Sequence, residues 1–198
     1  MAPLDLVVAT LNPGKAGELA ALLAGPGLRL FPLHEFPGAT PPDETGSSLL
    51  ENARIKARAA VGLTGLPAIA DDTGLEVDAL EGAPGHRAAR YAGPGANDAQ
   101  NVSLLLERMN GVPRERRAAR FRTVCVACFP DGTERVGEGV LEGAIAEAAR
   151  GTGGFGYDPI FVVAGLGRTL AELDEAEKNA LSHRGRAVQA LARHLPLG

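Results

Sequence analysis

The sequence predicts an α/β fold, with a mixed β-sheet flanked by helices and a second lobe built on a long hairpin. Short valine-rich runs alternate with helical patterns in the first part of the chain, and two long strand patterns follow Ala118. No internal repeat or low-complexity linker interrupts the 198 residues. We therefore expect residues 1–198 to form a single α/β domain of two lobes with no separable linker. A cleft between lobes is where such folds place ligands.

The first half of the chain alternates strand and helix patterns. Leu4 to Ala9 is a short apolar run, typical of a strand buried on both faces of a sheet. Ser47 or Ser48 can cap a helix, with Glu51 completing a capping box. The elements expected between and after these are a helix with Leu19, Leu22 and Leu23 on one face, a strand at 28–33, a Pro/Gly-rich loop at 37–46, the capped helix to about Val61, and strands at 67–70 and 75–80.

The second half contains the expected hairpin. Strand patterns at 121–129 and 134–145 are joined by a Pro-Asp-Gly turn. Before it, Asn97 can cap a helix with an apolar inner face. After it we expect a glycine-rich loop at 151–158, a strand at 160–163, and a closing helix at 181–195 with Ser182 as its cap.

Composition excludes several classes of protein. The formal net charge is −4 with no basic tail, which argues against nucleic-acid polymers as partners. The chain begins without a signal-peptide pattern and has no apolar stretch long enough for a membrane span, so we expect a soluble, cytoplasmic protein. Cys125 and Cys128 form a C-x-x-C pair, but the pair lies in a β-branched run without a second metal-binding pair. Buried packing is favoured over redox or zinc chemistry.

The loop from Thr10 to Lys15 is a candidate phosphate site. It follows a buried strand and opens a helix, whose first N–H groups and dipole favour anions. The chain has 20 lysines and arginines, and only Lys15, Lys56 and Lys178 are lysine. The alternative is a plain strand-to-helix turn. The candidate residues are Thr10, Leu11, Asn12, Pro13, Gly14 and Lys15.

Asp71 and Asp72 are candidate metal or catalytic carboxylates. We expect them at the end of an apolar strand, where neighbouring side chains point to opposite faces, so that one faces the cleft. Glu44 in the Pro/Gly-rich loop is a candidate second carboxylate. Mg²⁺ takes one or two protein carboxylates and completes its shell with water and phosphate oxygens. The alternative is a solvated strand end.

The segment GTGGFGYD at 151–158 contains a literal G-x-G-x-x-G. A dinucleotide-binding interpretation needs a strand before it and a helix after it, and neither pattern is present. What remains is a loop presenting Phe155, Tyr157 and Asp158, on which a planar base can stack, or a turn whose aromatic rings fill the core. Lys178, His183 and Arg184 cluster around a helix start; they suit carbonyl and phosphate oxygens, or form a surface charge cluster.

Taken together and in order, these segments resemble the inosine triphosphate pyrophosphatase family. The resemblance runs from about Leu6 to Ala187. It rests on TLNPGK, ENARIKA, AIADDTGLEVDAL, GAPG with ARYAG, GTGGFGYDPIF and EKNALSHRGRA. Residues 86–88 depart from it, because His-Arg-Ala stands where relatives usually carry an aliphatic residue, Tyr and Ser. The departure puts in doubt a hydroxyl at position 88 and leaves the carboxylates untouched.

The resemblance implies an elongated α/β fold with a central cleft, a homodimer, and Mg²⁺-dependent hydrolysis of the purine triphosphates ITP, dITP and XTP to the monophosphate and pyrophosphate. It implies that the 10–15 loop holds the triphosphate, with Lys15 as a catalytic cation. Glu44 and Asp72 would serve the metal, and Asp72 would also be the proton acceptor. The remaining residues assigned to the substrate are Lys56, Thr73, Phe155, Gly156, Tyr157, Asp158, Lys178, His183 and Arg184.

Three rival interpretations follow from the same residues. One is a pyrophosphatase acting on ordinary or pyrimidine triphosphates, which a panel of nucleotides separates. Another is a nucleotide-sensing module without catalysis, which releases no pyrophosphate. The third is an NAD-binding oxidoreductase, which would bind a nicotinamide cofactor.

Overall fold

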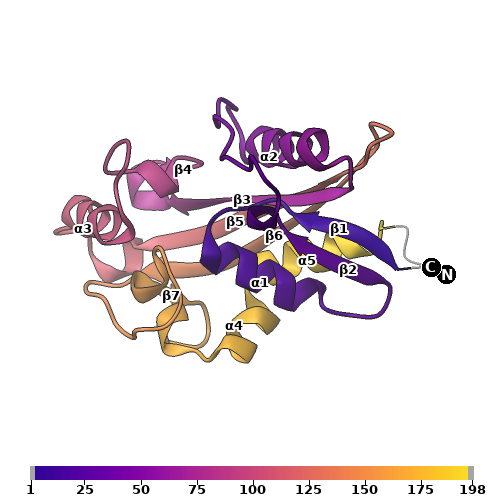
Figure 1. Cartoon of the computed structure of the whole chain (residues 1–198). Coiled ribbons are helices and arrows are strands. Elements are labelled where there is room, and N and C mark those ends of the chain that lie inside the picture. The colour runs from indigo at the N-terminus through magenta and orange to yellow at the C-terminus, as the bar shows by residue number, and fades with distance from the viewer. Residues whose placement is uncertain (1–2, 196–198) are drawn as a thin grey trace. The chain divides into compact units, whose positions relative to one another are not determined.

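The computed structural model describes residues 3–195 and has the mixed α/β architecture that the sequence predicts (Figure 1). One sheet has the strand order β2-β1-β3-β5-β6-β7, and β4 pairs with β3. β1 runs parallel to β2 and β3, whereas β4 is antiparallel to β3 and β7 antiparallel to β6. The strands are β1 Leu4–Val8, β2 Leu28–Pro32, β3 Ala68–Val77, β4 Pro84–Gly85, β5 Ala118–Cys128, β6 Glu134–Ile145 and β7 Phe161–Val163.

Two helices begin directly after capping residues that the sequence predicts, Ser48 and Asn97. Asn12 caps the first helix, Ser48 the second and Asn97 the third, each by accepting a main-chain N–H near the helix start. The closing helix expected at 181–195 spans His183–Ala192, and Ser182, its expected cap, instead ends a short helix that was not predicted. The α-helices are α1 Pro13–Leu23, α2 Leu49–Thr64, α3 Asp98–Arg108, α4 Glu175–Leu181 and α5 His183–Ala192.

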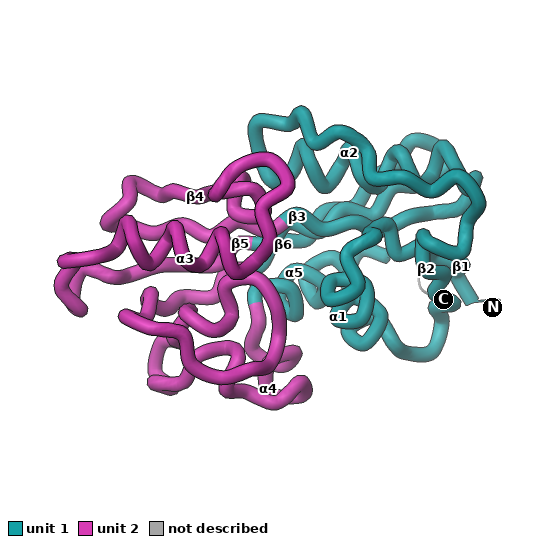
Figure 2. The backbone as a smooth tube through the Cα atoms, turned by 60° about the vertical axis from the view of Figure 1, so that its left-hand side comes forward, with its two compact units in different colours: residues 1–72, 123–139, 183–198 teal, residues 73–122, 140–182 magenta. Residues whose placement is uncertain are grey.

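The chain divides into two compact units, and β3, β5 and β6 contribute residues to both (Figure 2). Unit 1 comprises residues 1–72, 123–139 and 183–198, and unit 2 comprises residues 73–122 and 140–182. The single-domain organisation expected from the sequence stays a prediction.

Unit 1 has a three-layer packing around its strands. α2 covers one face, with Ala53, Ala57 and Ala60 buried against strand residues, and α1 and α5 cover the other (Figure 1). Cys128 is a buried thiol on the face that α2 covers, and Cys125 is one on the face that α1 and α5 cover. The expectation of packing cysteines is therefore confirmed.

Two glycines of β6 allow α5 to lie close to the sheet. A Cβ added at Gly139 would stand 2.1 Å from the carbonyl oxygen of His183, and one at Gly137 would stand 2.3 Å from that of Ala187. Any side chain there would push the helix away. These glycines therefore fix the depth at which the first turn of α5 sits in unit 1.

The core of unit 2 gathers around α3 and the hairpin. Leu105 from α3 and Met109 directly after that helix pack with Leu141 and Ile145 from β6 and with aromatic side chains of β5 and β7. Arg117 is buried beside this core and donates to four main-chain carbonyls, among them those of Ile145 at 2.7 Å and Ala146 at 2.8 Å. Its charge is thus satisfied by carbonyl dipoles.

Candidate functional site

The Asp71–Asp72 pair lies inside β3, not at a strand end, so the expected position is wrong. The strand continues because each carboxylate has its own cationic partner, which offsets the cost of burying a charge in mid-strand. Asp71 meets Arg184 and Lys15, and Asp72 meets Lys56. The expectation that the two side chains point to opposite faces is confirmed by these separate partners.

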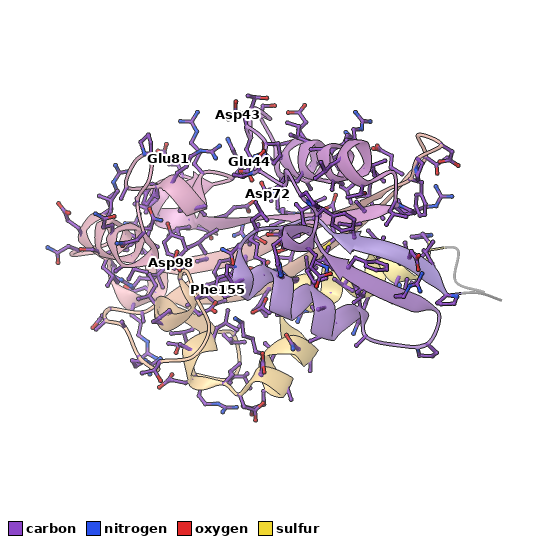
Figure 3. The ribbon with its side chains drawn as sticks, in the orientation of Figure 1. Asp43, Glu44, Asp72, Glu81, Asp98 and Phe155 are labelled. Carbon is purple, nitrogen blue, oxygen red and sulfur yellow. The ribbon has the colours of Figure 1, made fainter. Side chains whose placement is uncertain are left out.

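Asp72 and Glu44 converge on one ammonium group. Lys56 Nζ lies 2.8 Å from Asp72 Oδ1 and 2.9 Å from Glu44 Oε1. Glu44 comes from the Pro/Gly-rich loop, Lys56 from α2 and Asp72 from β3, and Figure 3 shows Glu44 and Asp72 as neighbours. Three separate stretches of unit 1 therefore bring two carboxylates to a shared cation.

Asn52 is a member of this group that the sequence analysis missed. It is fully buried, donates to Asp72 Oδ2 at 3.3 Å, and accepts the Gly46 N–H at 2.9 Å. One side chain thus holds both the carboxylate and the end of the loop that carries Glu44. Its spacing of four residues from Lys56 on α2 was the available signal, because residues four apart share a helix face.

On the other face of β3, Arg184 lies between two acids. Its Nη2 and Nε lie 3.0 and 3.1 Å from Asp71 Oδ2, and its Nη1 donates to Glu18 of α1. Arg184 is only 1% exposed and His183 4%, so the surface-cluster alternative is wrong for both residues. Glu18 was not predicted, because a single acid on an amphipathic helix normally indicates its solvated face.

The two aspartates differ in their protonation chemistry. Burial alone would raise the pKa of Asp71, but the charges of Lys15 and Arg184 outweigh it and lower that pKa. For Asp72 burial is the larger influence and raises the pKa, although Lys56 opposes it. Asp71 is therefore held as an anion, whereas Asp72 accepts a proton more readily than an ordinary aspartate does.

The 10–15 loop is ordered by its own side chains. Asn12 Oδ1 accepts the Lys15 N–H at 3.0 Å, and Thr10 Oγ1 accepts the Asn12 N–H at 3.2 Å. The side-chain oxygens of Thr10 and Asn12 thus act as acceptors within the loop. Lys15 Nζ lies 3.4 Å from Asp71, and burial lowers the pKa of Lys15 despite that neighbour. The loop therefore places a lysine beside the Asp71 group at a helix start.

A second polar group lies in unit 2. Lys178 Nζ is 2.6 Å from Asp158 Oδ2 and 4.8 Å from the centre of the Phe155 ring. Both charged residues are buried, so Lys178 is no surface charge either. A Cβ at Gly154 would meet Asp158 Oδ2 at 2.1 Å, which explains the glycine before Phe155. A base that stacks on Phe155 would find a lysine donor nearby.

The other predicted residues have distinct positions. Tyr157 is buried in the core of unit 2, and its hydroxyl donates to the Ala88 carbonyl at 2.8 Å, as the core-filling alternative expects. Its contact with substrate stays a prediction. Thr73 is the first residue of unit 2. His183 Nδ1 lies 3.1 Å from the hydroxyl of buried Thr123 on β5, a partner that the sequence analysis missed.

Residues 3–195 contain neither a cluster of metal-binding side chains nor a membrane-spanning helix. No group of three or more His, Cys, Asp or Glu side chains there is arranged to hold a metal ion. No helix in the same range has the length and apolar character needed to cross a membrane.

An α/β fold with buried carboxylates and lysines beside a helix start is typical of proteins that handle small phosphorylated molecules. The chain belongs to the Ham1 family, whose model matches residues 6–194. A dITP/XTP pyrophosphatase of Symbiobacterium thermophilum is 53% identical over 96% of this chain and 94% of its own length. One from Geobacter sulfurreducens is 50% identical over 96% of each chain.

Solved structures agree with the family assignment. A HAM1 protein from Coxiella burnetii has a TM-score of 0.86 and 44% identity, covering 96% of this chain and 98% of its own. A nucleoside-triphosphatase (dITP/XTP pyrophosphatase) from Mycobacterium abscessus has a TM-score of 0.74 and 46% identity, covering 98% of each chain. These likenesses confirm the fold class that the sequence predicts.

Proposed function

We propose that this chain hydrolyses deaminated purine nucleoside triphosphates, ITP, dITP and XTP, to the monophosphate and pyrophosphate. The reaction would cleanse the nucleotide pool of deaminated purines. The observation that carries the proposal is the convergence of Glu44 and Asp72 on Lys56 Nζ within unit 1. Membership of the Ham1 family and the chain's similarity to dITP/XTP pyrophosphatases support it.

The donor set fits Mg²⁺. Carboxylate oxygens are the protein ligands that this ion prefers, and it takes one or two of them together with water and substrate phosphates. Glu44 and Asp72 already direct oxygens to one positive group, Lys56 Nζ, so their placement suits a cation. These two residues would hold the ion, which would supply compensation for the charge that moves to the leaving pyrophosphate.

The residues of unit 1 divide the remaining chemistry. Asp72 takes the proton of the attacking water, for which its raised pKa suits it. Lys15 and Lys56 compensate phosphate charge, and Thr10, Leu11, Asn12, Pro13 and Gly14 form the loop that binds the triphosphate. Asp71, kept ionised between Arg184 and Lys15, holds those two cations in place.

Base recognition is assigned to the residues around Phe155. Hypoxanthine and xanthine present an acceptor at O6, where adenine presents a donor. Lys178 offers N–H donors beside the Phe155 ring, so adenine would meet a donor with a donor and lose a hydrogen bond, at a cost of about 1–3 kcal/mol. Thr73, Gly156, Tyr157, Asp158, His183 and Arg184 complete the proposed substrate contacts. We further propose a homodimer in the cytoplasm.

The test is pyrophosphate release from ITP, dITP, XTP, ATP, GTP and dTTP, with Mg²⁺ and with EDTA. We expect rapid release from the first three, little from ATP and dTTP, and none with EDTA. GTP shares the O6 acceptor, so its rejection must act through its 2-amino group. Hydrolysis in ¹⁸O-labelled water should place the label in the monophosphate, because attack is on the α phosphorus. Equal turnover of ATP and ITP, label in the pyrophosphate, or full activity in EDTA would each contradict the proposal.

A further inference from the structure

Both peptide groups that flank Phe155 donate to carboxylates. The Phe155 N–H donates to Asp158 Oδ2 at 2.9 Å, and the Gly156 N–H donates to Asp98 Oδ2 at 2.7 Å. Asp158 also accepts a hydrogen bond from Lys178, so it belongs to the polar group of unit 2 already described. Asp98 comes from a distant stretch of unit 2 and has no part in the proposed chemistry. It is the less expected of the two anchors.

The loop around Phe155 needs such anchors. Gly154 and Gly156, on either side of it, both have the left-handed backbone conformation, with φ of 72° and 62°. Glycine loses more conformational freedom on ordering than any other residue, so this stretch is costly to fix in one geometry. Hydrogen bonds to charged acceptors are among the stronger ones available to offset that cost.

Asp98 stands on a firmly held element. It is the first residue of α3, directly after the cap residue Asn97. Nearby, buried Asn101 accepts the Ala92 N–H at 2.9 Å and donates to the Ala89 carbonyl at 3.0 Å. Figure 3 shows Asp98 and Phe155 near one another. The anchor therefore ties the glycine-rich loop to the fixed start of a helix.

We propose that Asp98 is a positioning residue for base recognition, which holds the Phe155 loop in its binding geometry before the nucleotide arrives. The role in ordering the loop is inferred from the hydrogen bond between the Gly156 N–H and Asp98. The effect on nucleotide binding rests on the proposed function. A preordered loop spares the nucleotide the entropic cost of ordering it, so the anchor acts on binding and not on the chemical step.

The kinetic test compares three variants with the unmodified chain. D98A removes the acceptor, D98N keeps an oxygen acceptor, and N97A removes the cap of the same helix while leaving Asp98 in place. For D98A we expect a KM for ITP about three- to tenfold higher with kcat within about twofold. D98N should restore most of the affinity, and N97A should lower the melting temperature while leaving KM near its original value.

A second readout does not depend on turnover. The chain has no tryptophan, so the variant F155W carries a single indole at the loop. In the absence of nucleotide, its fluorescence anisotropy should fall when D98A is added and stay unchanged when N97A is added. If the unmodified chain fails to hydrolyse ITP, the proposed function fails, yet this measurement still decides whether Asp98 orders the loop.

Three outcomes would overturn the proposal. One is a D98A protein with unchanged KM and unchanged indole anisotropy. Another is a fall in kcat at constant KM, which would place Asp98 in the chemical step. The third is a matching effect of N97A, which would make the helix start, and not the Gly156 bond, the cause.

Discussion

The two polar groups are built on different supports. In unit 1, Lys56 and Asp72 project from α2 and β3, regular elements whose backbones are fixed by their own hydrogen bonds. In unit 2, Phe155 and Asp158 follow a glycine-rich stretch whose geometry depends on side-chain anchors. Rigid elements suit groups that must meet a reacting atom, whereas a loop suits the adjustable fit of a base. The comparison predicts that damage to the first group lowers kcat and damage to the second raises KM.

Replacing the proposed base should have the largest effect. D72N keeps the shape of the side chain but removes the proton acceptor, so we expect kcat for ITP to fall about 10²- to 10⁴-fold with little change in KM. Burial raises the pKa of Asp72, which means that folding penalises its charged form. D72N also takes from Lys56 one of its two close carboxylate partners, which opposes that gain, so thermal unfolding should show a melting temperature close to that of the unmodified chain.

The matched control is the exposed acid beside Glu44, Asp43. D43N removes a carboxylate from the same loop but leaves the Lys56 group intact, and its rates should be unaltered. Near-normal turnover by D72N would remove Asp72 from the catalytic role and dissolve the contrast between the two groups.

Removing the ring at position 155 tests the other side of the comparison. F155A should raise KM for ITP about 10- to 100-fold, since stacking a base on an aromatic side chain contributes about 1–3 kcal/mol. Initial rates over a wide range of nucleotide concentrations separate KM from kcat. F155L, which keeps bulk but no ring face, should resemble F155A, and F155Y should resemble the unmodified chain. A loss confined to kcat would contradict the assignment of the loop to binding.

The sequence predicted the elements better than the connections between them. Apolar periodicity and caps at Ser48 and Asn97 determine helix starts locally, so they could be found without a structure. Asn52 and Glu18 were missed, because a polar residue on a helix normally faces water, and only the tertiary fold shows that each meets a buried partner.

The same reasoning explains why the sequence predicted two strands, at 67–70 and 75–80, where the structure has the single strand β3. Two adjacent aspartates in an apolar run indicate a boundary unless their cations are known. Those cations come from residues 15, 56 and 184, far from β3 in the sequence. The local sequence pattern therefore identifies candidate site residues, whereas their pairing depends on tertiary contacts that a short stretch of sequence does not show.

The support of unit 1 can be tested through a glycine. In G139A the new methyl would stand 2.1 Å from the His183 carbonyl oxygen, a contact that neighbouring backbone must move to relieve. We expect a loss of about 1–3 kcal/mol in the free energy of unfolding, measured with urea.

G62A is the matched control, since Gly62 is an exposed glycine within α2 with open space around it. It should stabilise the chain by up to about 1 kcal/mol. If G139A and G62A changed the free energy of unfolding by the same amount and in the same direction, α5 would not depend on a close approach to β6.

The smallest effect should come from an ion pair at the edge of unit 1, outside both polar groups. Glu134 on β6 accepts from Arg54 of α2 at 2.8 Å, and this hydrogen bond holds the pKa of Glu134 below its usual value. A lowered folded-state pKa stabilises the fold above the unfolded value of 4.5, and the contribution is lost as pH falls through the folded value. E134Q should therefore cost about 0.5 kcal/mol near pH 7, discounted for solvent screening, and progressively less toward pH 4. Urea unfolding at several pH values measures this difference. If the loss of unfolding free energy in E134Q did not change with pH, the Glu134 side chain would act through packing and not through its charge.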